Sequence, residues 1–252
     1  MNDRKNKNNK HNSSSNNSHS LWLYGKHPTL LALANKNRLC HEILVTQTTY
    51  DKLKNELPTN VKLSVVNKET LESKVNKDAV HQGIIVRVSP LPILNLEDIT
   101  LDGPIVILDQ VTDPHNIGAI LRNCAAFDIK NIIVTKNNSP YESAVLAKSS
   151  SGALEKVNII RVTNLDRTIE KLKEQGYWCY GLAADTKLSI RQMKFSSKTA
   201  LIFGAEGSGL RNLTSKRCDE IIKIPMSNNV ESFNITNAVA ITLYELHIQL
   251  SN

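Results

Sequence analysis

The stretch Asp113-Pro-His-Asn-Ile-Gly-Ala-Ile-Leu-Arg122 follows a short apolar run, and two further polar stretches do the same later in the chain. They are Gly204-Ala-Glu-Gly-Ser-Gly-Leu210 and Ile224-Pro-Met226, the latter continued by Glu231-Ser-Phe-Asn-Ile-Thr236. A polar segment after an apolar run is expected at the carboxyl end of a β-strand. In an open α/β sheet this edge binds ligands, because loop side chains and helix-start amides converge there. The three stretches therefore predict one active site.

Around these stretches, apolar runs alternate with helical patterns. Such alternation is typical of a parallel sheet covered by helices on both faces. Strands are predicted over residues 105–108, 132–135, 157–162, 177–183, 200–203 and 220–224. Helices are predicted over residues 117–127, 142–149, 165–175, 209–217 and 234–250. Residues 104–252 are thus predicted to form an α/β/α domain with a parallel sheet.

Ahead of this domain, residues 21–89 show a smaller α/β pattern. Strands are predicted over residues 22–24, 41–46, 61–66 and 84–88, and helices over residues 28–34, 49–57 and 68–75. Residues 90–103 begin with Pro90 and Pro92 and are predicted to be a stiff linker. Residues 1–20 hold almost no apolar side chain, so nothing offsets the entropy cost of ordering them. A disordered basic tail is therefore predicted before the two domains.

The composition limits the partners and the compartment. The 252 residues include 31 Lys and Arg against 24 Asp and Glu, which favours a polyanionic partner such as RNA. Charge alone fits an ordinary basic protein equally well. The four cysteines stand far apart, without metal-ligand spacing, so reduced thiols and no metal are expected. No apolar run reaches the roughly 20 residues that span a bilayer, and the N-terminus lacks a signal-peptide core. We therefore expect a cytoplasmic protein without a membrane partner.

Taken in order, the three stretches resemble the motifs of the SpoU (TrmH-type) RNA ribose methyltransferases of the SPOUT superfamily. Residues 116–122 match the family's Asn-x-Gly-x-x-x-Arg motif, and residues 204–210 match its Gly-Ala-Glu-Gly-x-Gly-Leu loop. Residues 224–236 match its Ile-Pro-Met and Ser-Leu-Asn-Val-Ser segments. Two short sequences in residues 21–89 resemble motifs of the family's substrate-binding domain: Tyr24-Gly-Lys-His-Pro28 and His81-Gln-Gly83. That domain is similar in fold to ribosomal protein L30e.

This resemblance implies a fold, a cofactor and roles for named residues. It implies an L30e-like RNA-binding domain over residues 21–89, a deep trefoil knot in the C-terminal domain, S-adenosylmethionine as cofactor and a homodimer. Arg122 is implied to act on the ribose 2′-hydroxyl, often across the dimer interface. The other implied catalytic residues are Asn116, Glu206, Ser232 and Asn234, and the implied cofactor-binding residues are Gly204, Ile224, Phe233, Ala183 and Met226. Phe233 replaces the usual leucine, and Asn228-Asn229 replace a glycine-containing turn.

The residues themselves predict local structure at these positions. Asn116 is placed to cap a helix beginning at Ile117, and Ser232 and Asn234 are placed to cap the last helix. Arg122 lies in apolar company, which predicts a buried side chain with an anionic or polar partner. Structural readings stay open beside the catalytic ones: a salt bridge or rim position for Arg122, and a plain strand-to-helix turn for residues 204–210.

We therefore expect an S-adenosylmethionine-dependent RNA 2′-O-methyltransferase that needs no metal. It most resembles the RlmB-like branch, which modifies a guanosine of 23S ribosomal RNA, and a tRNA ribose methyltransferase is the near alternative. An inactive RNA-binding protein on the same scaffold and a small-molecule methyltransferase are the rival classes. Because guanidinium stays protonated at ordinary pH, our hypothesis is that Arg122 orients the 2′-hydroxyl and stabilises its oxygen as the proton leaves.

Overall fold

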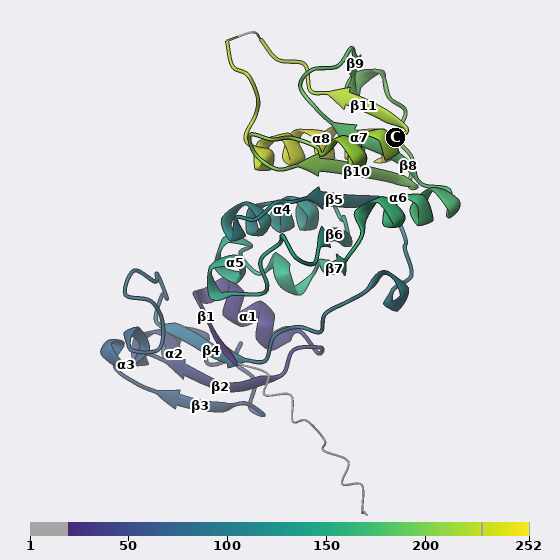
Figure 1. Cartoon of the computed structure of the whole chain (residues 1–252). Coiled ribbons are helices and arrows are strands. Elements are labelled where there is room, and N and C mark those ends of the chain that lie inside the picture. Colours follow the sequence, from purple (N-terminus) through teal and green to yellow (C-terminus); the bar gives the residue numbers. More distant parts are fainter. Residues whose placement is uncertain (1–19, 228, 252) are drawn as a thin grey trace, which may run out of the picture.

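The computed structural model describes residues 20–227 and 229–251. The tail predicted over residues 1–20 lies, apart from Ser20, outside the described residues, as does Asn228. The described chain forms two β-sheets with helices packed against them (Figure 1). The smaller sheet belongs to the N-terminal module (residues 21–88), and the larger sheet is built from strands between residues 105 and 223.

The N-terminal module has four strands and three helices among its described residues. The strands are β1 (Leu21–Tyr24), β2 (Cys40–Val45), β3 (Lys62–Val65) and β4 (Ile84–Val88), in the sheet order β1-β4-β2-β3. β4 runs antiparallel to β1 and β2, whereas β2 and β3 are parallel. The helices are α1 (Lys26–Ala34), α2 (Gln47–Leu53) and α3 (Lys68–Glu72). Helix α2 begins and ends earlier than predicted. It begins at Gln47 because the Thr46 carbonyl oxygen, directly after β2, accepts the first helical hydrogen bond, from the Tyr50 backbone N–H.

The larger sheet has seven strands in the described chain, and every neighbouring pair is parallel. The strand order is β7-β6-β5-β10-β8-β11-β9. The bounds are β5 (Ile105–Asp109), β6 (Asn131–Thr135), β7 (Asn158–Val162), β8 (Trp178–Leu182), β9 (Leu188–Ser189), β10 (Thr199–Gly204) and β11 (Glu220–Lys223). The six predicted strands are confirmed, each within one residue at either end. Strand β9 was missed, because two residues are too few to carry a periodic pattern.

Helices cover both faces of this sheet, as predicted. They are α4 (Pro114–Ala126), α5 (Ala144–Ser149), α6 (Leu165–Glu174), α7 (Asn212–Arg217) and α8 (Ile235–Ser251), with short 3₁₀ turns at Leu96–Asp98, Ala153–Glu155 and Ile190–Gln192. Side chains alternate along β5, so that Val106 and Leu108 belong to the core cluster that includes α4 and α8. Ile105 and Ile107 belong to the cluster that includes α6. All four side chains are fully buried.

The starts of two helices, α4 and α7, differ from the prediction by three residues each. Asp113, not Asn116, is the N-cap of α4: its side chain accepts a hydrogen bond from the His115 backbone N–H at 2.9 Å, and Pro114 occupies the first helical position. The predicted capping role of Asn116 is therefore wrong. Helix α7 begins three residues later than predicted, since Gly209 has a φ of +65° and bridges back to Ala205.

Arg38 fastens the N-terminal module to the larger one. Its side chain is fully buried and forms ion pairs with Glu142 and Glu155, whose side chains are 10% and 3% exposed. The guanidinium also donates to the Ser89 carbonyl oxygen at 3.0 Å. Burial lowers the pKa of Arg38, yet hydrogen bonding to Glu155 and the charges of both carboxylates raise it above its ordinary value. Figure 1 shows α1 and α5 between the two sheets, and in the chain Arg38 follows α1 whereas Glu142 precedes α5.

The connection between the modules packs against the larger sheet. Leu94 forms a parallel bridge with Ile160, and the Arg161 backbone N–H donates to the Leu94 carbonyl oxygen at 2.9 Å. Leu91 packs against the shared core cluster, and Leu96 packs against the cluster on the α6 face. The stretch predicted to be a stiff linker is therefore held in place by contacts along its length.

Candidate functional site

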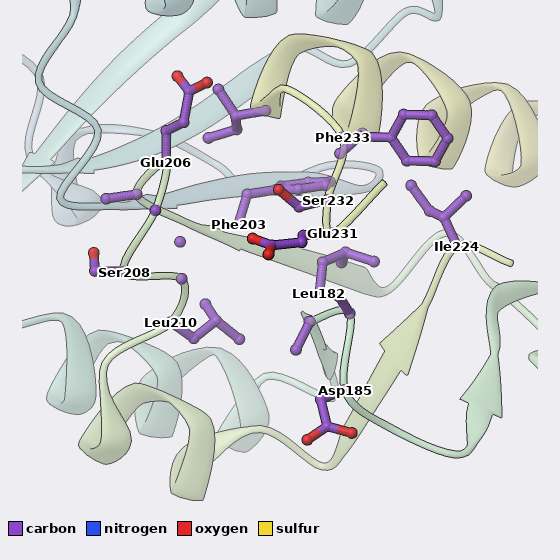
Figure 2. Close-up of a pocket in the computed structure, with 18 of the residues that line it drawn as sticks. Leu182, Asp185, Phe203, Glu206, Ser208, Leu210, Ile224, Glu231, Ser232 and Phe233 are labelled. Atoms are coloured by element: carbon purple, nitrogen blue, oxygen red, sulfur yellow. The ribbon is translucent and has the colours of Figure 1, made fainter. Parts of the chain in front are cut away.

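A cavity of about 500 Å³ lies at the carboxyl ends of β8, β10 and β11, the sheet edge that the three motifs predicted (Figure 2). Cavities of roughly 300–1,000 Å³ are typical of small-molecule sites. Three loops form its wall, one after each strand, and the start of α8 closes it. The lining includes Leu182, Ala183, Asp185, Gly204, Glu206, Ser208, Leu210, Ile224, Met226, Glu231, Ser232 and Phe233.

The loop over residues 204–210 folds back on itself beside the cavity. A Cβ atom on Gly204 would lie 2.0 Å from the Gly209 carbonyl carbon and 2.3 Å from the Leu210 nitrogen. The Gly209 backbone N–H donates to the Ala205 carbonyl oxygen at 2.9 Å, and Gly207 has a φ of +83°. The close crossing at residue 204 leaves no room for a side chain, and glycine favours the left-handed backbone at residue 207. The loop is therefore a tighter structure than a plain strand-to-helix turn.

Glu206 joins the first motif to the third. Its Oε2 accepts a hydrogen bond from Asn116 Nδ2 at 3.4 Å, and its Oε1 accepts one from Asn234 Nδ2 at 3.3 Å. The three side chains come from α4, the loop after β10 and the start of α8, so the fold brings together predicted site residues that are distant in the chain. Both bonds are long and solvent-exposed, which leaves the three side chains free to rearrange around a ligand.

The third motif has one capping residue rather than two. Asn234 Oδ1 accepts hydrogen bonds from the Thr236 backbone N–H at 2.9 Å and from Thr236 Oγ1 at 2.6 Å, so Asn234 caps α8 as predicted. The predicted capping role of Ser232 is wrong, because α8 begins only at Ile235. Ser232 instead lines the cavity, and Figure 2 shows it beside Glu231.

The five predicted cofactor-binding residues all line the cavity: Gly204, Ile224, Phe233, Ala183 and Met226. Ile224 and Phe233 lie next to each other in Figure 2 and supply an apolar side. Leu182, Asp185, Ser208 and Glu231 also line the cavity and were not predicted. The position of Asp185, just after the predicted strand over residues 177–183, is the signal that would have found it.

The charge of the cavity is negative. Asp185, Glu206 and Glu231 contribute carboxylates, and the described lining contains neither Lys nor Arg. In Figure 2 the Glu231 carboxylate lies among the lining side chains, whereas Glu206 points away from their centre. A negative cavity with apolar walls suits a cationic ligand that also carries an apolar or aromatic part.

Arg122 lies apart from this cavity. It stands six positions after Asn116 on α4, which places the two side chains roughly 120° apart around the helix. Arg122 is exposed, and its side chain makes no hydrogen bond or ion pair with the described residues. The prediction of a buried side chain with a polar partner is therefore wrong for the single chain, because this helix face is not covered by another of its described elements. Of the two open alternatives, the exposed side chain fits the rim position and not the salt bridge.

Two stretches of the N-terminal module that resemble family motifs, Tyr24–Pro28 and His81–Gly83, lie close to Lys148 of α5 in the larger module. Gln82 Oε1 accepts from the Lys26 backbone N–H at 3.0 Å and from Lys148 Nζ at 3.5 Å, and Lys148 Nζ also donates to the Val80 carbonyl oxygen at 3.0 Å. Burial lowers the pKa of Lys148. The stretches Tyr24–Pro28 and His81–Gly83 thus take part in module docking.

Two features are absent from the described residues. No helix among them is both long enough and apolar enough to cross a membrane. No group of three or more His, Cys, Asp or Glu side chains among them is placed to hold a metal ion.

Comparison with known proteins places the chain in a family. The model of the SpoU rRNA Methylase family matches residues 103–244, and the model of the RNA 2′-O ribose methyltransferase substrate-binding domain matches residues 22–94. The chain belongs to the SpoU rRNA methylase family. The first match contains all three motifs and every residue that forms the cavity, and the second covers the N-terminal module.

Two relatives extend this SpoU assignment over most of the chain. The 23S rRNA (guanosine-2′-O-)-methyltransferase RlmB of Vibrio vulnificus is 40% identical over 235 residues, which cover 89% of this chain and 95% of that protein. RlmB of Escherichia coli K12 is 38% identical over 237 residues, which cover 90% of this chain and 97% of that protein.

A solved structure with the same fold is the SpoU methyltransferase AviRb of Streptomyces viridochromogenes in complex with the cofactor AdoMet. It superposes with a TM-score of 0.78 at 21% identity and covers 91% of this chain and 90% of that one. At this identity the likeness shows the fold: an α/β protein with a parallel sheet and an N-terminal α/β module.

Proposed function

We propose that this SpoU family member transfers a methyl group from S-adenosylmethionine to the ribose 2′-hydroxyl of a guanosine in 23S ribosomal RNA. The near full-length similarity to two RlmB proteins supports the reaction and its substrate. The observation that carries the proposal is the negative, glycine-walled cavity formed by the second and third motifs.

The cavity residues fit the cofactor. S-adenosylmethionine supplies, when bound, an activated methyl group on a positively charged sulfonium. The carboxylates of Asp185, Glu206 and Glu231 match that charge, and Ile224 and Phe233 offer an apolar surface to the adenine. Backbone groups of the 204–210 loop approach a ligand closely, because its glycines carry no side chain. Ala183 and Met226 complete the wall.

Arg122 acts, in this proposal, from the partner copy of a homodimer. Helices α4 and α8 pack side by side, and α8 exposes Ile241, Tyr244 and Ile248 at helical spacing. Such an exposed apolar stripe is typical of a protein interface. A symmetric interface here would cover the face that bears Arg122 and carry its guanidinium toward a second cavity. Arg122 then orients the 2′-hydroxyl and stabilises the oxygen as its proton leaves, while Asn116, Glu206, Ser232 and Asn234 order the site around it.

The N-terminal module (residues 21–89 in the predicted domain division) binds the RNA in this proposal. It matches the family's substrate-binding model, and it is fixed to the larger module through Arg38 and Lys148.

We further propose that this module is L30e-like and that the protein acts in the cytoplasm. Residues 104–252 form, in this proposal, the methyltransferase domain, with its C-terminal part threaded into a trefoil knot. The strand order β5-β10-β8, in which β10 lies between two strands that precede it in the chain, is compatible with such threading.

The experiment that tests this function is mass-spectrometric mapping of ribose methylation in ribosomal and transfer RNA from cells with and without the protein. We expect one 2′-O-methylguanosine of 23S RNA to disappear and to return on complementation with the wild-type gene. Loss of a methyl group from transfer RNA instead would assign the near alternative. Unchanged maps, together with RNA binding but no S-adenosylmethionine binding in calorimetry, would show an inactive RNA-binding protein.

A second measurement tests the dimer. Light scattering should give the mass of two chains for the wild type and one chain for Tyr244→Glu, which places a charge in the exposed stripe of α8. Mixing an Arg122→Ala variant with a Gly204→Val variant should restore activity that neither shows alone. In a mixed dimer, the Arg122→Ala chain supplies an intact cavity and the Gly204→Val chain supplies an intact Arg122 to that same site. No restoration would contradict the sharing of sites.

A further inference from the structure

We propose that Asp109 and Arg211 are positioning residues that hold the 204–210 loop in its cofactor-binding shape. This inference rests on the proposed function, since it concerns the wall of the proposed S-adenosylmethionine cavity. Neither residue was singled out from the sequence, and neither lines the cavity.

Asp109 is a buried carboxylate at the carboxyl end of β5. Its side chain is 0% exposed, and it lies in register with Gly204, the last residue of β10. Such a carboxylate needs charge-assisted hydrogen bonds, because an unpaired buried charge is strongly unfavourable. The Arg211 side chain provides one from Nε to Asp109 Oδ1 at 2.7 Å, and the Arg211 backbone N–H provides another to Oδ2 at 3.3 Å.

These two hydrogen bonds fix the C-terminal end of the 204–210 loop to β5. Arg211 follows Leu210 directly, and the Leu210 backbone crosses Gly204 so closely that a Cβ there would meet it at 2.3 Å. Within the loop, the Gly209 N–H donates to the Ala205 carbonyl oxygen. Thus the neighbouring strand β5 fixes the position at which the loop returns over β10.

In the described chain, the side-chain hydrogen bonds made by the loop's own residues are weaker. Glu206 accepts exposed bonds of 3.3 and 3.4 Å from Asn234 and Asn116. The bond between Arg211 and Asp109 is shorter and has a buried acceptor, so it holds the loop more firmly. Without it, Leu210 and Gly209 would be free to shift, and the cavity wall would lose its shape before any ligand arrives.

A different role for Arg211 makes different predictions. Its side chain is 40% exposed, so an arginine at this place is also suited to contact an RNA phosphate. A phosphate contact affects RNA affinity and its salt dependence, whereas a loop-holding role affects S-adenosylmethionine. The two roles are therefore separable by measuring the two substrates independently.

The test compares Arg211→Met, Arg211→Lys and Asp109→Asn with the wild type in S-adenosylmethionine calorimetry and in steady-state kinetics. We expect Arg211→Met to weaken S-adenosylmethionine binding about tenfold, the effect of one lost charge-assisted bond, and to raise KM for the cofactor equally. KM for RNA and its salt dependence should not change. Arg211→Lys should recover part of the affinity, and Asp109→Asn should behave like Arg211→Met.

Arg217→Met is the matched control. Arg217 lies on α7, and this substitution removes only an exposed ion pair with Glu170. Its cofactor affinity should equal that of the wild type. Wild-type cofactor affinity in folded Arg211→Met, or a rise in KM for RNA alone, would overturn the inference. Absence of cofactor binding in the wild type would instead overturn the proposed function. If Asp109→Asn fails to fold, Arg211→Lys and Arg211→Met still decide the outcome.

Discussion

Arg38 and Arg122 differ in burial and in their interaction partners. Arg38 is fully buried between two carboxylates at the junction of the modules, and Arg122 is exposed on α4 without a partner in the described chain. A buried guanidinium is fixed by its partners and stabilises one arrangement of the modules. An exposed, unpaired guanidinium adds little to stability and stays available to a ligand or to a second protein copy. The first arginine fixes the junction of the modules, and the second leaves one face of α4 available for binding.

The largest expected effect is on stability, from Arg38→Met. This change leaves the carboxylates of Glu142 and Glu155 buried without their cation. We expect a loss of about 3–5 kcal/mol in the free energy of unfolding, measured by urea denaturation. The control is Lys62→Ala, which removes an exposed ion pair with Glu42 and should change stability by less than about 1 kcal/mol. Equal effects of the two changes would remove the distinction between junction and surface.

The next largest effect is on catalysis, from Arg122→Ala. Because Arg122 has no partner in the described chain, unfolding should be unchanged within about 0.5 kcal/mol. Methyl transfer should fall by about 10²–10³, as for loss of a group that stabilises developing negative charge. Arg167→Ala is the matched control, since Arg167 is also exposed, on α6 at the other face of the sheet. Full activity of Arg122→Ala would place the arginine outside the reaction.

A smaller effect distinguishes two roles for Arg122. Arg122→Lys keeps a positive charge but loses the planar fork of donors. If the role is electrostatic, this variant should retain measurable activity that increases at raised pH, where the 2′-hydroxyl loses its proton more readily. The measurement is a pH profile of methyl transfer with saturating RNA. An inactive Lys variant with normal RNA binding would contradict a purely electrostatic role.

The smallest effect concerns thiols in the rigid part of the larger module. Burial raises the pKa of Cys179 and of Cys218 to about 12, so thiolate is scarce at pH 8. Alkylation of both cysteines should therefore be slow at pH 8 and should rise about tenfold per pH unit, whereas the unfolded chain levels off above pH about 8.5. Fast alkylation at pH 8 in the native protein would show that this core opens readily.

The sequence predicted more of the larger module's strands than of its helix boundaries. Runs of three or four buried apolar residues mark β5, β6 and β10, because strands buried on both faces are mostly apolar. The start of α4 was predicted at the wrong residue. Asp113 and Asn116 are both good capping residues, and the choice depended on Pro114, which favours the first helical position.

The sequence by itself determined the parallel sheet and the edge at which its motifs lie, since strand periodicity and turn chemistry are set by neighbours in the chain. The resemblance to the SpoU family added five of the residues that line the cavity. Only the tertiary structure decided that Glu206 bridges Asn116 and Asn234, that Arg122 lies on an uncovered face, and that Asp109 holds Arg211. These facts depend on β10 lying beside β5 and on which helix faces are covered. The physical reason is that burial and long-range hydrogen bonds follow from strand order, which no local pattern of side chains specifies.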